Sequence, residues 1–221
     1  MNTQLIVALD VPDRQSAQQY VKLLVKENTL FKVGLRLFVA EGPDVVRMVQ
    51  EEGGDVFLDL KFHDIPNTVA QACEAALNLK PFMLNIHAVG GSEMARAAVA
   101  ALKNSQPRPL LVGVTVLTSD PEETSTKEVV RERALLCQKE GLDGVVCSPQ
   151  EIQIVRQTCG EKFVIVTPGI RLPSDSPDDQ KRTSTPLEAA KAGAHYIVMG
   201  RPILTSKDPL KTVREIKNQL R

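Results

Sequence analysis

Two aspartates and two lysines stand at the ends of short apolar runs in the first third of the chain. Asp59 and Lys61 are separated by one residue, so on a strand both side chains point to the same face. Asp64 follows three residues later and can bring a further carboxylate near the lysine, while Asp10 follows the first apolar run and Lys32 lies on the second. Opposite charges within ~4–6 Å keep one another ionised. The set therefore predicts a charged catalytic array centred on an ammonium group.

A second group of residues, mostly in the last quarter of the chain, indicates anion binding. Gly200 and Arg201 follow an apolar run, where a glycine amide, a helix start and an arginine fork can together receive a phosphate. Arg171 and Gln180 belong to a long polar loop of the kind that often forms a lid, and we expect them to close over that phosphate. Thr118 can offer its hydroxyl or amide to a substrate. For the first group, the alternative is a structural salt-bridge cluster. For the second group, it is a solvated surface loop.

A parallel barrel would bring both groups together. Short apolar runs alternate with longer segments of helical spacing, which is typical of βα units, and about eight such runs are needed to close a barrel. Two helices carry their own start signals, at Ser148 and at Thr185, each followed by proline and then, three residues after the cap, by glutamate. The expected strands are residues 5–9, 30–33, 56–60, 82–86, 110–116, 144–147, 163–166 and 195–199.

We therefore predict an α/β fold, a single (β/α)8 TIM barrel that spans residues 1–221. The competing architecture is an open doubly wound sheet, which would usually place a glycine-rich phosphate loop after its first strand. The first run here ends in Ala-Leu-Asp-Val-Pro without a glycine. Catalytic residues of a barrel lie at the C-terminal ends of its strands. His63 and His87 fall at this rim, where we expect them to support neighbours rather than bind substrate, and His195 falls at the opposite face.

Composition argues against several classes of protein. The 221 residues include 27 lysines and arginines against 27 aspartates and glutamates, so no net field attracts nucleic acid or an anionic membrane. The four cysteines form no C-x-x-C pair and lie in apolar stretches, which favours buried, reduced thiols over disulfides or a zinc site. The first apolar run is too short for a signal peptide or a membrane span, and we expect a cytoplasmic protein.

Five segments distributed from the first strand to the last form one pattern: Leu9-Asp10, Phe31-Lys32-Val33-Gly34, residues 59–68 (DLKFHDIPNT), Pro168-Gly169-Ile170-Arg171 and Gly200-Arg201-Pro202-Ile203. Together they resemble the orotidine 5′-phosphate decarboxylase family. The resemblance implies that the chain converts orotidine 5′-monophosphate (OMP) to UMP and carbon dioxide in de novo pyrimidine biosynthesis, without a metal or an organic cofactor.

The same resemblance implies a role for each site residue. Lys61 would protonate C6, the pyrimidine carbon that loses carbon dioxide, and Asp59 would lie beside the substrate carboxylate. Lys32 and Asp64 would complete the charged array. The other implied roles are ribose binding by Asp10 and Lys32, pyrimidine contact by Thr118, phosphate binding by Gln180, Arg171, Gly200 and Arg201, and a homodimer in which Asp64, Ile65 and Thr68 reach into the neighbouring subunit's site.

Other functions stay open at this point. Magnesium-dependent sugar-phosphate enzymes of the hexulose-phosphate synthase or ketogulonate-phosphate decarboxylase type share the D-x-K-x-x-D segment, but usually carry a glutamate where this chain has Lys32. A ribulose-phosphate epimerase would need a metal-binding His-x-Asp on the second strand. An aldolase would use Lys61 as a Schiff base, although two nearby carboxylates favour its non-nucleophilic ammonium form. A noncatalytic nucleotide-binding barrel would not need both Lys61 and Asp59.

Overall fold

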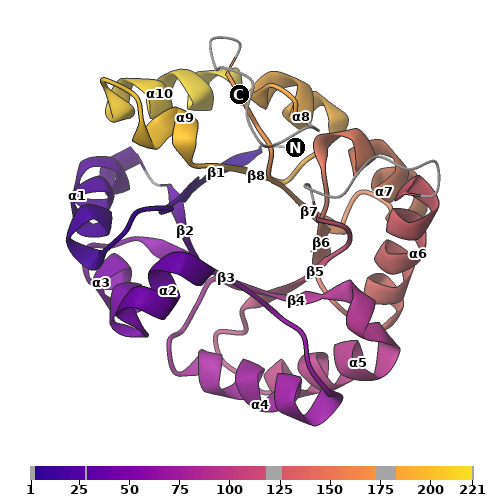
Figure 1. The fold of residues 1–221 in the computed structure, drawn as a ribbon. Coiled ribbons are helices and arrows are strands. Elements are labelled where there is room, and N and C mark those ends of the chain that lie inside the picture. Colours follow the sequence, from indigo (N-terminus) through magenta and orange to yellow (C-terminus); the bar gives the residue numbers. More distant parts are fainter. Residues whose placement is uncertain (1–2, 28, 118–125, 173–182, 221) are drawn as a thin grey trace.

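The computed structural model of the chain describes residues 3–27, 29–117, 126–172 and 183–220. Within these residues, the strands form one closed parallel barrel in which every strand pairs with its neighbours in the sequence, and the first pairs with the last (Figure 1). The prediction of a (β/α)8 barrel is confirmed. The strands are β1 (Gln4–Ala8), β2 (Leu30–Gly34), β3 (Asp55–Phe62), β4 (Met83–His87), β5 (Leu110–Val114), β6 (Gly144–Val146), β7 (Val164–Thr167) and β8 (Tyr196–Met199).

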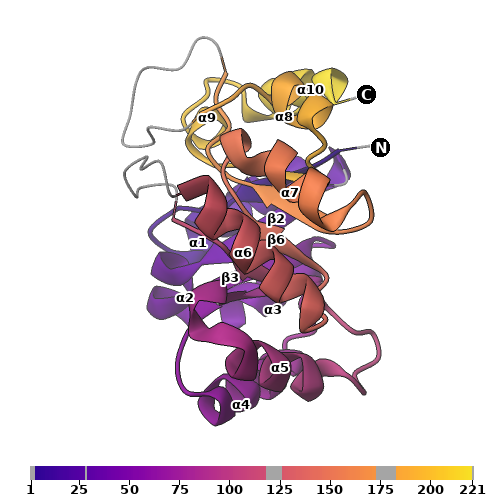
Figure 2. The same cartoon turned by 90° about the vertical axis from the view of Figure 1, so that its right-hand side faces the viewer.

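Helices surround the strands as an outer ring (Figure 1), and Figure 2 shows α6 and α7 side by side on the outside of the barrel. None of the described helices is long and apolar enough to cross a bilayer. The helices are α1 (Arg14–Leu24), α2 (Leu35–Glu41), α3 (Asp44–Glu51), α4 (Pro66–Leu77), α5 (Gly91–Leu102), α6 (Thr126–Lys139), α7 (Ile152–Cys159), α8 (Pro186–Ala192), α9 (Arg201–Leu204) and α10 (Pro209–Gln219), with 3₁₀ turns η1 (Val25–Glu27), η2 (Ala88–Gly90) and η3 (Pro149–Glu151).

Both predicted helix starts are present. The Thr185 hydroxyl accepts a hydrogen bond from the Glu188 N–H, and the Glu188 carboxylate accepts one from the Thr185 N–H at 2.9 Å, which caps α8. That helix ends at Ala192 and is capped by Gly193, whose φ of 102° only glycine adopts easily. At Ser148 the chain first makes the turn η3 and then enters α7, and the Glu151 carboxylate accepts from the Ser148 N–H at 2.8 Å.

The expected strands differ from the observed ones by at most two residues at either end. The largest extension is in β3, which continues to Phe62 because this residue pairs with Ile86 beyond a shift in register. β5 ends two residues early, at Val114. Such shifts are ordinary for boundaries read from apolar patterns, because a strand ends where its backbone pairing ends and not where its apolar residues do.

The core has two layers because successive strand residues point to opposite faces of the sheet. Side chains such as Leu5 and Val7 point outward and pack in the layer of buried residues beneath the helices. The alternate residues fill the interior of the barrel, so that it is a packed core rather than a pore. This inner layer consists of Ile6, Ala8, Leu30, Phe57, Met83, Val112, Val166 and Val198.

Arg156 and His195 close the N-terminal end of the barrel, so His195 lies at the face where we expected it. Arg156 is 9% exposed and donates hydrogen bonds to the backbone carbonyls of Gly160, Glu161, Phe163 and Gly193. His195 Nδ1 faces the same guanidinium and the Ile165 N–H, two groups that can only donate. The Nδ1 atom therefore carries no proton and His195 is the neutral Nε2–H tautomer.

All four cysteines are free and buried, as expected. Burial raises the pKa of the Cys73 and Cys137 thiols to about 12, which leaves them protonated at neutral pH. The thiols therefore act as small apolar side chains of the core.

Candidate active site

A cavity of about 240 Å³ opens at the C-terminal ends of the strands. Residues from both groups singled out in the sequence line it, because the loops that follow the strands meet at this rim. Asp10 and Lys32 come from the ends of β1 and β2, and Asp59 and Lys61 come from β3. From the other wall, the loops after β7 and β8 contribute Arg171, Gly200 and Arg201.

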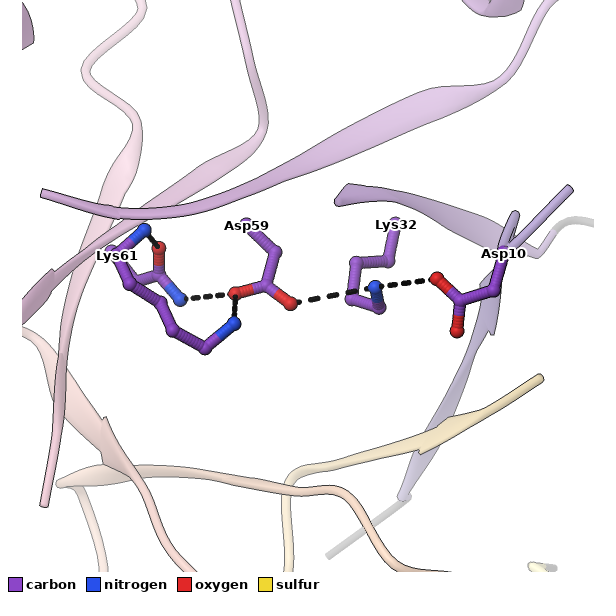
Figure 3. Close-up of polar contacts among 5 residues, drawn as sticks. Asp10, Lys32, Asp59 and Lys61 are labelled. Carbon is purple, nitrogen blue, oxygen red and sulfur yellow. Dashed lines mark hydrogen bonds and ion pairs between the residues drawn. The ribbon is translucent and has the colours of Figure 1, made fainter. Parts of the chain in front are cut away.

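Asp10, Lys32, Asp59 and Lys61 form an unbroken row of alternating charges along one wall of the cavity (Figure 3). The Lys32 Nζ atom lies 3.1 Å from Asp10 Oδ1 and 3.4 Å from Asp59 Oδ2. The Lys61 Nζ atom donates to the other oxygen of Asp59, Oδ1, at 2.6 Å. Each carboxylate oxygen of Asp59 therefore faces a different ammonium group.

The row stays charged although its centre is buried. The side chains of Lys32 and Asp59 are each 12% exposed. Burial by itself would lower the pKa of Lys32, but the carboxylates of Asp59 and Asp10 outweigh it and raise that pKa above its usual value. Burial would likewise raise the pKa of Asp59, but Lys32, Lys61 and a hydrogen bond from Asn85 lower it. Neither central group gives up its charge near neutral pH.

Lys61 sits at an irregular point of the backbone. Its φ is 52°, in the left-handed region that a residue with a side chain rarely adopts, and the pairing of β3 with β4 shifts register between Leu58 and Phe62. Its N–H donates to Asn85 Oδ1 at 2.7 Å, and Asn85 Nδ2 donates to Asp59 Oδ1, also at 2.7 Å. Asn85 is not among the site residues predicted from the sequence. The available signal was an amide in the apolar β4, on the inward face that it shares with Met83.

Two glycines make room for the row. A Cβ atom at Gly34 would lie 2.8 Å from Lys32 Nζ, so any side chain there would displace the ammonium group. At Gly200, a Cβ atom would lie 3.3 Å from both Ala8 Cβ and Asp10 Oδ2. The loop after β8 therefore passes directly beside the Asp10 end of the row, and α9 begins one residue later.

Of the residues expected to contact phosphate or pyrimidine, Arg171, Gly200 and Arg201 line the cavity. Thr118 and Gln180 lie outside the described residues. Among the described residues, no group of three or more histidines, cysteines, aspartates or glutamates is placed to hold a metal ion.

Asp64, Ile65 and Thr68 are exposed, and they do not line the cavity of their own chain. The Asp64 carboxylate accepts a hydrogen bond from the Ile65 N–H at 2.7 Å, and within the described part of the chain it forms no ion pair with Lys61. A single chain thus does not bring the third carboxylate to the lysine. The contribution of these residues to a second copy stays a prediction.

His63 and His87 contact each other, with ring centroids 5.7 Å apart, and neither lines the cavity. The expectation that they support their neighbours rather than bind substrate also stays a prediction.

Comparison with known proteins gives one family. Residues 3–216 match the model of the Orotidine 5′-phosphate decarboxylase / HUMPS family. An orotidine 5′-phosphate decarboxylase of Moorella thermoacetica is 48% identical over 230 residues, covering 98% of this chain and 91% of its own, and one of Geobacter sp. is 45% identical, covering 98% and 95%. The crystal structure of orotidine 5′-phosphate decarboxylase from Lactobacillus acidophilus superposes with a TM-score of 0.86 at 34% identity and covers 99% of both chains.

Proposed function

Because the chain belongs to the orotidine 5′-phosphate decarboxylase / HUMPS family, we propose that residues 1–221 form one catalytic domain that converts OMP to UMP and carbon dioxide in pyrimidine biosynthesis. The observation that carries the proposal is the order of groups along the cavity. Gly200 adjoins Asp10 at one end of the charged row, and Lys61 stands at the other end. A phosphate held by Gly200 and Arg201 would then place a ribose against Asp10 and Lys32 and a base at Lys61.

Lys61 supplies the chemistry in this proposal. Breaking the bond between C6 and the carboxylate releases carbon dioxide and leaves an electron pair in the plane of the pyrimidine ring, where the π system cannot absorb it. A fixed ammonium group stabilises that pair electrostatically and then donates its proton to C6, which completes UMP. The resulting amine regains a proton from solvent. Asp59, 2.6 Å from Lys61, holds the ammonium group in place and lies beside the departing carboxylate.

Groups remote from C6 contribute the remaining rate acceleration. Enzymes lower reaction barriers by roughly 8–23 kcal/mol, which is more than one lysine supplies. Binding energy from Arg171, Gly200 and Arg201 at the phosphate, joined by Gln180, orients the substrate and drives closure of the site. Thr118 contacts the pyrimidine in the same proposal, and Asp10 and Lys32 bind the ribose hydroxyls.

The competing function within the family is that of a magnesium-dependent sugar-phosphate enzyme. The position of Lys32 argues against it, since its ammonium group already lies 3.1 Å and 3.4 Å from two carboxylates of the cavity. A divalent cation bound by Asp10 and Asp59 would be repelled by that charge. We therefore propose catalysis without a metal or an organic cofactor.

A second copy of the chain is the partner we propose. Exposed apolar side chains follow the C-terminal ends of three adjacent strands: Leu35 and Val39 on α2 are 54% and 80% exposed, Ile65 before α4 is 65% exposed, and Val89 on η2 is 49% exposed. Burial of this rim in a homodimer would carry Asp64, Ile65 and Thr68 toward the partner's cavity. The balanced charge supports a small-molecule substrate rather than nucleic acid or a membrane, and the buried free thiols support a cytoplasmic setting.

One absorbance assay tests substrate, reaction and cofactor independence together. The chain is expected to consume OMP in buffer that contains EDTA, and Lys61→Ala is expected to abolish turnover while UMP binding, measured by calorimetry, largely survives. Loss of wild-type activity in EDTA that magnesium restores would favour the sugar-phosphate type of enzyme. Turnover unchanged by Lys61→Ala would remove the catalytic assignment.

Mixing two inactive variants tests the shared site. In a heterodimer of Asp64→Ala and Lys61→Ala chains, one of the two cavities has both groups intact. Random exchange of subunits should therefore restore about one quarter of wild-type activity. If the mixture stays as inactive as its components, Asp64 does not act across an interface.

A further inference from the structure

We propose that Asn85 is a positioning residue for the decarboxylation, because its side-chain amide fixes both the backbone of Lys61 and the carboxylate of Asp59. This inference rests on the proposed function. Asn85 lies on β4 and is 1% exposed, and it is absent from the lining of the cavity. It therefore acts on the substrate only through its two partners on β3, whose contact is drawn in Figure 3.

The two hydrogen bonds settle how the amide is oriented. A backbone N–H can only donate, so the atom that faces the Lys61 N–H at 2.7 Å is Oδ1 of Asn85. The other end, Nδ2, then faces Asp59 Oδ1 at 2.7 Å, where an ionised carboxylate needs a donor. An acceptor and a donor on one short planar group are what a carboxamide provides. An aspartate would lack the donor, and an aliphatic side chain would lack both.

Lys61 needs this support because its backbone is strained. A non-glycine residue in the left-handed region is disfavoured, and such a conformation persists only where its surroundings impose it. The register of β3 shifts at this point, and the amide oxygen of Asn85 takes the place of a strand carbonyl as acceptor for the Lys61 N–H. Without that acceptor, the backbone is free to relax toward an ordinary strand conformation.

Asn85 also controls the far end of the lysine side chain. Asp59 Oδ1 accepts from Asn85 Nδ2 at 2.7 Å and from Lys61 Nζ at 2.6 Å, so the amide holds the oxygen against which the ammonium group rests. The Asn85 side chain thus holds the backbone N–H of Lys61 directly and the Nζ atom of Lys61 through Asp59. A displacement of about 1 Å at a reacting group can reduce the rate about 10²-fold.

The test compares Asn85→Leu, which removes both hydrogen bonds, with Asn85→Asp, which keeps the acceptor and loses the donor. Thr115→Val is the matched control, since Thr115 is fully buried directly after the neighbouring strand β5, and its hydroxyl, which this change removes, donates to the Val146 carbonyl. We expect kcat for OMP to fall about 10²-fold in Asn85→Leu while KM stays within about threefold, because the phosphate and ribose contacts are untouched. The control should leave kcat within about threefold.

The Asn85→Asp variant separates positioning from a loss of packing. At neutral pH, its introduced carboxylate repels Asp59, and kcat should be low. As the pH falls, that carboxyl gains a proton and becomes a donor again, so the ratio of variant to wild-type kcat should rise toward acid. A ratio that does not change with pH overturns the proposal, as does an Asn85→Leu variant with wild-type kcat or with a loss equal to that of Thr115→Val.

A second measurement keeps this inference separate from the proposed function. Carbon-13 NMR titration of the Asp59 carboxyl needs no turnover, and the Asp59 pKa should rise in Asn85→Leu but not in Thr115→Val. If wild type does not decarboxylate OMP while the NMR shift is present, the function fails and the link between Asn85 and the charged row holds. If wild type is active and the Asp59 pKa is the same in Asn85→Leu as in wild type, the positioning role is rejected.

Discussion

The two ion pairs of Lys32 allow a direct test of whether burial or distance determines the coupling energy of an ion pair in the charged row. Its ammonium group lies closer to Asp10, at 3.1 Å, than to Asp59, at 3.4 Å, but the Asp10 side chain is 55% exposed and that of Asp59 is 12% exposed. We would measure each pair in a double-mutant cycle, combining Lys32→Met with Asp59→Asn in one cycle and with Asp10→Asn in the other. The two cycles share one ammonium group, so each serves as the control for the other.

The expected energies follow from Coulomb's law. The difference in distance favours the Asp10 pair by only about a tenth, because the energy scales as the inverse of the separation. An effective dielectric constant of 20 around the buried pair gives about 5 kcal/mol at this distance, whereas the value of water gives about 1.3 kcal/mol for the exposed pair. Relaxation of the protein and solvent around the charges reduces both Coulomb energies, and coupling energies between contacting residues are usually about 0.5–3 kcal/mol. We expect about 2–3 kcal/mol for Lys32 with Asp59 and less than about 1 kcal/mol for Lys32 with Asp10.

Urea unfolding of the wild type, the three single variants and the two double variants at pH 7 gives both coupling energies. The measurement is repeated at high salt, which should weaken the exposed pair and leave the buried pair nearly unchanged. Coupling to Asp10 that equals or exceeds coupling to Asp59 would show that distance outweighs burial and would refute the reasoning. Two couplings below about 0.5 kcal/mol would show that neither ion pair of Lys32 contributes measurably to stability.

Two further predictions concern the opposite ends of the barrel. Burial and the Arg156 guanidinium lower the pKa of His195 from 6.5, against the opposing effect of Glu161. The unfolded chain therefore binds this proton more readily, and the free energy of unfolding should fall as the pH drops below 6.5. His195→Asn keeps an acceptor for Arg156 but cannot titrate. In urea unfolding between pH 5 and 8, its free energy of unfolding should therefore fall less steeply toward acid pH than that of the wild type. The same pH dependence in both proteins would exclude His195 as the cause. Arg201→Ala should raise KM and lower kcat/KM for OMP, whereas Arg214→Ala, which removes an exposed ion pair with Glu27, should change neither in steady-state assays. Equal kinetics for the two arginine variants would remove the phosphate contact.

The fold could be predicted because its signals are local. Each strand is a short apolar run, and the starts of η3 and α8 are marked by Ser148 and Thr185 with a glutamate three residues on. The ends of β1, β2 and β3 then give Asp10, Lys32, Asp59 and Lys61 from topology alone, since barrels collect strand ends at one rim. Gly200 and Arg201 follow from the same rule.

What the sequence did not reveal depends on contacts between strands. Asn85 is 24 residues from Lys61, and its role becomes visible only where the register of β3 shifts against β4. The left-handed φ of Lys61 has no sequence signal either, since lysine does not favour that region. For Asp64, spacing in the sequence was not enough to locate the side chain. Its position near Lys61 suggested a carboxylate beside that lysine, but in the folded chain Asp64 is exposed and its carboxylate accepts from the Ile65 N–H.

Closure of the barrel joins segments from opposite ends of the chain. The Thr3 hydroxyl donates to the Ala194 carbonyl, the Gln4 N–H donates to the His195 carbonyl, and β1 pairs with β8. On the ribosome, β1 can pair on one side with β2 but keeps a bare edge of backbone donors and acceptors until residues 196–199 have emerged from the exit tunnel. The nascent chain therefore exposes this unpaired strand edge from the synthesis of β1 until that of β8, and the barrel closes only after β8 has emerged.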